Sequence, residues 1–325
     1  MKIATYYCRV LLASCATLAA IMGAQACATE TWNPSGPVNV IVGFTAGGPT
    51  DTLARKLSDL VSKDIPRPLI VHNKPGAAGS VAVSYLARQA PDGLNLGMLL
   101  IGAVVNQHIR KVDYDTNQMT PIIMFGTLPQ GIVVKADAPW KTAREFFDYA
   151  KTHPNGIRFS TAGIGTAQHF SMERLGKALG VQWTHVPYKS GTEAVTAVMA
   201  GEVEAAAQTA EWSPLVKSGK LRLLTTFTEN RMDDFPDVPT LREQGVDIVA
   251  PSLMGVIGPK GMRPDVVKRW HDAFAPAMKD QSFLTMLSNL GIEPALKNSQ
   301  EFGEYLKMTN SFYGRLAEQF AQANK

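Results

Sequence analysis

Short apolar runs alternate with helix-like patterns along this chain of 325 residues, and that alternation limits the possible folds more than any other feature. The first apolar run covers residues 38–44, after which Leu53, Leu57 and Leu60 recur at helical spacing. An apolar run followed by a helical pattern is typical of strand–helix–strand units in a largely parallel sheet. The sequence therefore predicts an α/β fold.

The same order of patterns occurs a second time, which predicts two lobes. Strands are predicted at 38–44, 69–72 and 94–101 in the first series, and at 157–161, 183–187, 203–207 and 221–226 in the second. Gly180 and Gly201 are predicted to end two helices of the second series. A third segment is predicted to be helical at 266–278, 283–290 and 302–320, and to return to the first lobe. We expect each lobe to be a mostly parallel sheet flanked by helices, with lobe 1 formed by 29–134 and 251–325 and lobe 2 by 135–250.

Residues 1–28 have the pattern of a cleaved secretory signal. Lys2 and Arg9 precede an apolar stretch at 10–22, and small residues before Cys27 and before Thr29 suit a signal peptidase. The stretch is too short to cross a membrane, which takes ~20 residues. The alternative is a lipid-carrying Cys27 or Cys15, but Cys27 lacks the usual upstream leucine and Arg9 interrupts the segment before Cys15. We therefore predict export without a lipid anchor.

Composition and missing motifs exclude several classes of protein. The net charge is 32 − 28 = +4 without a Lys/Arg cluster, so no nucleic-acid partner is expected. All three cysteines lie in the predicted leader and the histidines lack metal-ligand spacing, so neither a metal nor a cofactor is expected. The nucleophile elbow, the zinc-protease helix and the phosphate-binding P-loop are absent. In 163–168 the third glycine of a dinucleotide motif is replaced by Gln168.

Two strand–loop–helix junctions remain as candidates for chemistry, one in each predicted lobe. The loops are Thr45-Ala46-Gly47-Gly48 before Pro49, and Ala162-Gly163-Ile164-Gly165-Thr166 before Ala167. The first turn of a helix has N–H groups without helical partners and a partial positive charge, so it can bind a carboxylate or phosphate. One such loop alone is most simply an ordinary turn. Two loops that can face one cleft favour binding of an anionic ligand.

An ordered series of short motifs runs from about residue 37 to the C-terminus: Val42-Gly43-Phe44-Thr45-Ala46-Gly47-Gly48 with Asp51, Asn73-Lys74-Pro75-Gly76-Ala77-Ala78-Gly79, Ala90-Pro91-Asp92-Gly93, Ser160-Thr161-Ala162-Gly163-Ile164-Gly165-Thr166 with His169, Val186-Pro187-Tyr188-Lys189-Ser190-Gly191, Gly201-Glu202-Val203-Glu204, Ser218-Gly219-Lys220-Leu221-Arg222 and Phe235-Pro236-Asp237-Val238-Pro239-Thr240. With this series the chain resembles the substrate-binding proteins of tripartite tricarboxylate transporters, the Bug-type receptors.

The resemblance implies a monomeric periplasmic binding protein of type II character that closes on a small carboxylate and serves transporter membrane subunits. It implies ligand-binding roles for Phe44, Thr45, Ala46, Gly47 and Gly48, for Thr161, Ala162, Gly163, Gly165, Thr166, Ala167 and His169, and for Gln208 with Thr209. Thr45 stands where the family usually has proline, and Gln208 lies where Asp or Asn is more usual. Both departures argue against the usual small dicarboxylates as ligands.

Three functions are compatible with these observations. A solute receptor is favoured; an exported α/β enzyme acting on a carboxylate, and a receptor used in signalling or scavenging without its own transporter, are the alternatives. Turnover of a bound carboxylate would identify the enzyme. For the receptor we expect backbone N–H groups of the two loops to hold the carboxylate, because neither loop contains Lys or Arg. The nearby Lys189 is expected to matter less.

Overall fold

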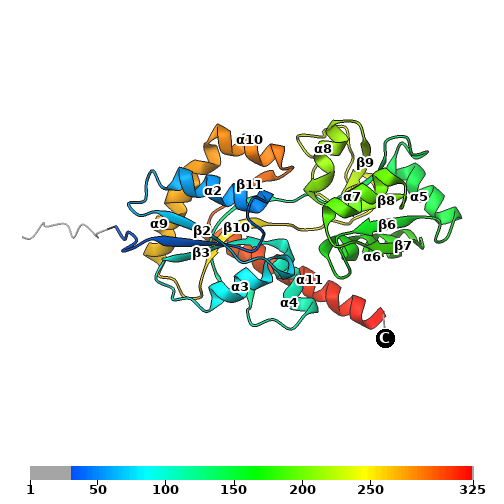
Figure 1. The fold of residues 1–325 in the computed structure, drawn as a ribbon. Helices are drawn as coiled ribbons and strands as arrows, with labels where there is room; N and C mark the ends of the chain where they lie inside the picture. Colours follow the sequence, from blue (N-terminus) through cyan, green and yellow to red (C-terminus); the bar gives the residue numbers. More distant parts are fainter. Residues whose placement is uncertain (1–30, 324–325) are drawn as a thin grey trace, which may run out of the picture. The chain divides into compact units, whose positions relative to one another are not determined.

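The computed structural model describes residues 31–323, of which those from Asn33 onward belong to one compact unit. Two separate sheets, each flanked by helices, form the cores of two lobes (Figure 1). The predicted leader lies outside the described residues. Among the helices that are described, none has the length and apolar character needed to cross a membrane.

The first sheet has six strands in the order β11-β4-β10-β3-β1-β2. β1 is parallel to β2 and β3, whereas β10 is antiparallel to β3 and β4, and β11 is antiparallel to β4. The strands are β1 (Val38–Val42), β2 (Leu69–Asn73), β3 (Asn95–Leu100), β4 (Thr120–Thr127), β10 (Met254–Gly258) and β11 (Glu293–Lys297).

The second sheet has five strands in the order β7-β6-β8-β5-β9. β6 is parallel to β7 and β8, and β5 is antiparallel to β8 and β9. The strands are β5 (Gly131–Lys135), β6 (Arg158–Thr161), β7 (Thr184–Pro187), β8 (Ala205–Gln208) and β9 (Leu221–Thr226). The two-lobed α/β fold is confirmed, but both sheets are mixed rather than mostly parallel. Apolar strand patterns do not encode direction, so the antiparallel strands were not distinguishable from parallel ones in the sequence.

Ten α-helices are described, six with the first sheet and four with the second. The first group is α2 (Pro49–Val61), α3 (Ser80–Ala87), α4 (Ile101–Ile109), α9 (Pro264–Phe274), α10 (Gln281–Asn289) and α11 (Ser299–Ala323). The second group is α5 (Ala143–Thr152), α6 (Ala167–Leu179), α7 (Gly191–Ala200) and α8 (Ser213–Lys217). Short 3₁₀ turns are η1 (Ala77–Gly79), η2 (Thr116–Gln118), η3 (Ala210–Trp212), η4 (Arg242–Gln244) and η5 (Ala275–Lys279). The predicted helix ends are confirmed, since Gly180 and Gly201 follow α6 and α7 with φ of +67° and +76°.

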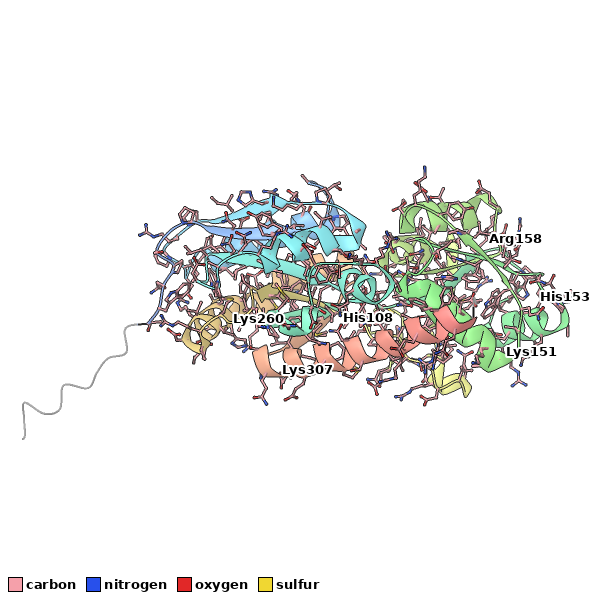
Figure 2. The ribbon with its side chains drawn as sticks, turned by 90° about the horizontal axis from the view of Figure 1, so that it is seen from below. His108, Lys151, His153, Arg158, Lys260 and Lys307 are labelled. Atoms are coloured by element: carbon pink, nitrogen blue, oxygen red, sulfur yellow. The ribbon has the colours of Figure 1, made fainter. Side chains whose placement is uncertain are left out.

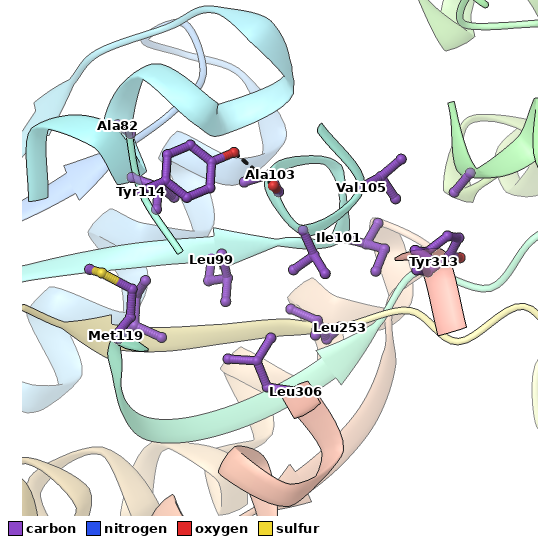
Figure 3. Close-up of a cluster of buried hydrophobic side chains, with 14 of the residues drawn as sticks. Ala82, Leu99, Ile101, Ala103, Val105, Tyr114, Met119, Leu253, Leu306 and Tyr313 are labelled. Atoms are coloured by element: carbon purple, nitrogen blue, oxygen red, sulfur yellow. Dashed lines mark hydrogen bonds between the residues drawn. The ribbon is translucent and has the colours of Figure 1, made fainter. Parts of the chain in front are cut away.

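Clusters of buried apolar side chains hold the layers together in both lobes. In the first lobe, one cluster lies between the sheet and α3, α4 and α11 and includes Leu99, Ile101, Leu253 and Leu306 (Figure 3). In the second lobe, α5 and α6 cover one face of the sheet and α7 and α8 cover the other. The first-lobe cluster also contains Ala167 and Phe170 of α6. The two lobes are therefore packed together where α6 begins.

The chain passes between the lobes at 128–130 and at 251–253, because Phe227, Leu241, Ile248 and Ala250 still pack in the second-lobe cluster. The boundary predicted between 134 and 135 falls inside β5, which pairs in the second sheet, so the first crossing comes earlier than predicted. An apolar run near a crossing does not reveal which sheet it joins. The two crossings are linked by a hydrogen bond from Leu128 N–H to Ser252 Oγ (3.1 Å), and Gln130 O accepts from Phe227 N–H (2.9 Å) where the second lobe begins. Tyr313 of α11 adds a hydrogen bond from its hydroxyl to Pro251 O (2.9 Å).

Candidate ligand-binding site

The two glycine loops occupy equivalent places in the two sheets. β1 has β2 on one side and β3 on the other, and β6 has β7 on one side and β8 on the other. The next strand in the chain is therefore placed on one side of β1 and the following strand on its other side, and the same holds for β6. In open α/β sheets, ligands bind beyond the carboxyl end of the strand at which this order reverses. The predicted loops follow these two strands.

The first loop is held by the carboxylate of Asp51, in the first turn of α2. Gly47 N–H donates to this carboxylate (2.9 Å), as do the Arg55 guanidinium (3.0 Å) and the Asn73 amide (2.9 Å). Asp51 is only 3% exposed, and its hydrogen bond with Arg55 is the main cause that lowers its pKa to about 2. Asn73 also donates to Phe44 O (3.0 Å). Asp51 is therefore a structural anion that orders the loop.

These contacts decide which N–H groups of the first loop remain available. Gly47 N–H is bonded to Asp51, and Gly48 N–H donates to Thr45 O (3.2 Å). The N–H groups of Thr45, Ala46 and Thr50 have no hydrogen-bond acceptor among residues 31–323. Thr45 and Ala46 are exposed. The free N–H groups on the exposed part of this loop are thus those of Thr45 and Ala46, whereas those of the two glycines are already bonded.

The second loop is closed by its own hydroxyls and glycines. Gly163 and Gly165 have φ of +131° and +75°, where other residues are strained. Thr166 caps α6 by accepting from His169 N–H (3.3 Å), and its hydroxyl donates to Gly163 O (2.9 Å). Thr161 Oγ1 accepts from Gly163 N–H (3.2 Å). Within the described part of the chain, the N–H groups of four residues have no acceptor: Ile164, Thr166, Ala167 and Gln168.

His169 supports the second loop from behind. Gly165 N–H donates to its Nδ1 (3.1 Å), which places the ring proton of the neutral imidazole on Nε2. The ring is 5% exposed, stacks on His185 at 3.9 Å and meets Phe320 edge-on at 5.1 Å. Burial lowers the pKa of both histidines to about 4. His169 is therefore uncharged at neutral pH, and Gly165 N–H is bonded to it rather than free.

Gln208 ends β8, the strand beside β6. It is fully buried, and neither polar atom of its amide has a hydrogen-bond partner among the described residues. The indole Nε1–H of Trp212 donates to the backbone carbonyl of Gln208 (2.9 Å), which fixes the turn after the strand. Thr209, the next residue, is also buried. Buried side-chain amides without a hydrogen-bond partner are uncommon in folded proteins, so the Gln208 amide is a candidate for a hydrogen bond to a bound molecule.

Sequence reasoning missed Glu211 and the start of α7 as parts of this site. A β-carbon at Gly191 would lie 2.5 Å from Glu211 Oε1 and 3.0 Å from Gln208 Oε1, so all three residues meet there. Ser190 and Gly191 follow β7 in the same strand–loop–helix arrangement as the two glycine loops. That repeated arrangement was the signal in the sequence that could have identified them.

The second loop and Gln208 thus lie together, at the neighbouring carboxyl ends of β6 and β8. The second loop also contacts the first lobe, because a β-carbon at Gly165 would lie 2.8 Å from Ile109 of α4. Ala167 and Phe170 are packed in the first-lobe cluster. The residues predicted in the second loop therefore lie at the junction of the lobes, whereas Phe44 to Gly48 lie at the corresponding edge of the first sheet.

Basic side chains occur on both lobes, and several of them are paired with carboxylates. Labelled basic residues such as Lys151, Arg158, Lys260 and Lys307 are spread over both lobes (Figure 2). Arg158 is paired with Glu204 at 2.7 Å. Among residues 31–323, no group of three or more His, Cys, Asp and Glu side chains is arranged to hold a metal ion.

Residues 53–321 match the model of the tripartite tricarboxylate transporter family receptor, TctC. A protein encoded in the gbd 5' region of Cupriavidus necator is 38% identical over 291 residues, which cover 89% of this chain and 88% of that relative. A TctC solute-binding protein from Polaromonas, solved without ligand, has a TM-score of 0.79 at 30% identity and covers 88% of this chain and 99% of its own.

Two similar structures contain ligands. An R. palustris protein solved with adipate has a TM-score of 0.76 at 25% identity and covers 88% of this chain and 97% of its own. MatC from Rhodopseudomonas palustris, solved with bound malate, has a TM-score of 0.72 at 26% identity and covers 87% of this chain and 99% of its own. Together with the match over 53–321, these similarities show that the chain belongs to the tripartite tricarboxylate transporter receptor family.

Proposed function

We propose that this chain is an extracytoplasmic solute receptor that binds a small carboxylate between its lobes and delivers it to a tripartite tricarboxylate-type transporter. The observation that carries the proposal is the pair of loops after β1 and β6, each at the strand where the sheet order reverses and each with unpaired backbone N–H groups. Such groups at helix starts attract anions without a basic side chain.

Backbone N–H donors from both loops are expected to contribute to the free energy of ligand binding. Thr45 and Ala46 supply N–H groups in the first lobe, and Ile164, Thr166, Ala167 and Gln168 supply them in the second. A hydrogen bond to a charged group contributes ~1.5–3 kcal/mol, so two such bonds supply about 3–6 kcal/mol of the roughly 8 kcal/mol that a micromolar dissociation constant requires. Burial of the rest of the ligand must supply the remainder. The Thr45 hydroxyl adds a donor. Asp51 does not oppose the ligand strongly because Arg55 offsets its charge.

The relatives that bind adipate and malate support a carboxylate as the class of ligand. By the same relationship we propose that residues 1–28 are an export signal, that the mature chain acts in the periplasm as a monomer without a lipid anchor, and that membrane subunits receive the ligand. We also propose that 128–130 and 251–253 act as the hinge when the lobes close. No residue is assigned a catalytic role, because His169 is buried, uncharged and bonded to Gly165.

Calorimetry on the mature chain tests the proposal. We expect at least one acid from a panel of four- to six-carbon carboxylates, including malate and adipate, to bind. We expect the matching diamide to fail, because it lacks the charge. Lys189→Ala should leave the affinity within about threefold, since the Lys189 side chain is exposed and its charge is screened by salt.

The bound acid should be recovered unchanged after long incubation, which nuclear magnetic resonance of the mixture would show. Conversion of the acid would favour the enzyme instead. Equal binding of acid and diamide, or loss of binding in Lys189→Ala, would contradict anchoring by backbone donors.

A further inference from the structure

The start of α7 already holds a negative charge of the protein itself. A β-carbon at Gly191, the first residue of this ten-residue helix, would lie only 2.5 Å from Glu211 Oε1. The Glu211 carboxylate therefore lies against the first turn of α7. Thr209 Oγ1 donates to Glu211 Oε2 (2.9 Å) and holds the side chain there. A carboxylate at a helix N-terminus is favourable. The same position is thereby unfavourable for a carboxylate of a ligand.

Glu211 is nevertheless open to an incoming group. Its side chain is exposed, and no Lys or Arg side chain in the described part of the chain forms an ion pair with it. Its carboxylate can accept hydrogen bonds at more sites than Thr209 fills. Glu211 is therefore an acceptor, and a negative one, at the carboxyl ends of β7 and β8.

Gln208 gives an independent reason to expect a ligand group at this place. Its side-chain amide is fully buried, is unpartnered among residues 31–323, and its Oε1 would lie 3.0 Å from a β-carbon at Gly191. It thus points toward the same helix start as Glu211. A buried amide without partners costs free energy unless another molecule supplies the missing bonds.

We propose that Gln208 and Glu211 form a distal subsite that selects the end of the ligand remote from the carboxylate held by the glycine loops. This inference rests on the proposed function. Because the subsite presents a carboxylate and an amide, it favours a hydrogen-bond donor, either an ammonium or a hydroxyl group, over a second carboxylate. The ligand is therefore an amino- or hydroxy-monocarboxylate rather than a dicarboxylate.

A series of three acids of matched length tests the subsite: glutarate, 5-hydroxypentanoate and 5-aminopentanoate. By calorimetry on the mature wild type, we expect both donor-ended acids to bind more tightly than glutarate, by about 10- to 100-fold for the ammonium. In Glu211→Gln the negative charge is gone, so glutarate should gain affinity and the difference should shrink to about threefold or less. Glu145→Gln, which alters a carboxylate at the start of α5 in the same lobe, should keep the wild-type ranking.

Thermal melting of each variant separates ligand selection from folding. If Glu211 merely stabilises α7, Glu211→Gln lowers the melting temperature but leaves the ranking of the three acids unchanged, and the inference is wrong. Tighter binding of glutarate than of both donor-ended acids by the wild type also overturns it. If none of these acids binds, nor malate, adipate or any other acid of the panel, the proposed function fails rather than the subsite alone.

Discussion

Gly43→Ala is expected to lower the stability of the protein by about 2–4 kcal/mol, or roughly 5–10 °C in melting temperature. Gly43 lies directly after β1, and a β-carbon there would lie 2.5 Å from Gly79 Cα and 3.1 Å from Gly79 O. Both contacts are with backbone atoms, so no side chain can turn aside. The first loop must move away from η1, and carboxylate affinity should fall with it.

Gly36→Ala is the matched control, because a β-carbon at Gly36 would have no atom within 4 Å. Its melting temperature should stay within about 1–2 °C of the wild type. Thermal denaturation followed by circular dichroism compares the two variants. Equal melting temperatures would mean that the loop after β1 and the turn at η1 are not packed as tightly as described.

The stability of the wild type is expected to fall as the pH drops from about 6.5 to 4, in part through His169. Its pKa is lowered from 6.5 to about 4 by burial, so the unfolded chain takes up protons in this range and the folded chain does not. The stabilisation is fully present above pH 6.5 and declines toward pH 4, by roughly 2–3 kcal/mol for this residue. Glu173, whose pKa is raised by burial, acts in the opposite direction.

Two variants isolate the contribution of His169. In His169→Asn the amide oxygen can replace Nδ1 as acceptor for Gly165 N–H but does not titrate, so stability should depend less on pH. His169→Phe should lose about 1–3 kcal/mol at pH 7, because it leaves a buried N–H without a partner. Urea denaturation at a series of pH values measures both effects. A decline in His169→Asn as steep as in the wild type would show that other groups cause it.

The order and type of many elements were predictable, because periodicity and punctuation are local properties of the sequence. Pro49 begins α2 and Gly180 ends α6, as predicted. Strand direction was not predictable, since β10 and β5 are as apolar as the parallel strands beside them. The helix α4 was missed because its apolar residues continue directly from β3, without a turn between them.

The candidate site was predictable as loops but not as individual donors. Glycine and helix-start signals located both junctions, and the topology places them at equivalent strands. The bonds from Gly47 to Asp51 and from Gly165 to His169 depend on side-chain positions that spacing does not reveal. Because Gly47 and Gly165 use their N–H groups in these bonds, the N–H groups available to a ligand belong to neighbouring residues. Glu211 was missed because it follows β8, whereas Gly191, beside which it lies, follows β7. Sequence spacing does not reveal such a contact.

Anchoring by the two loops is tested most directly by a crystal structure of the mature protein with the tightest-binding acid of the calorimetric panel. Carboxylate oxygens are expected about 2.7–3.1 Å from backbone N–H groups of both loops, at Thr45 or Ala46 and at Ile164, Thr166, Ala167 or Gln168. A carboxylate held by a Lys or Arg side chain, with no contact to either loop, would contradict it.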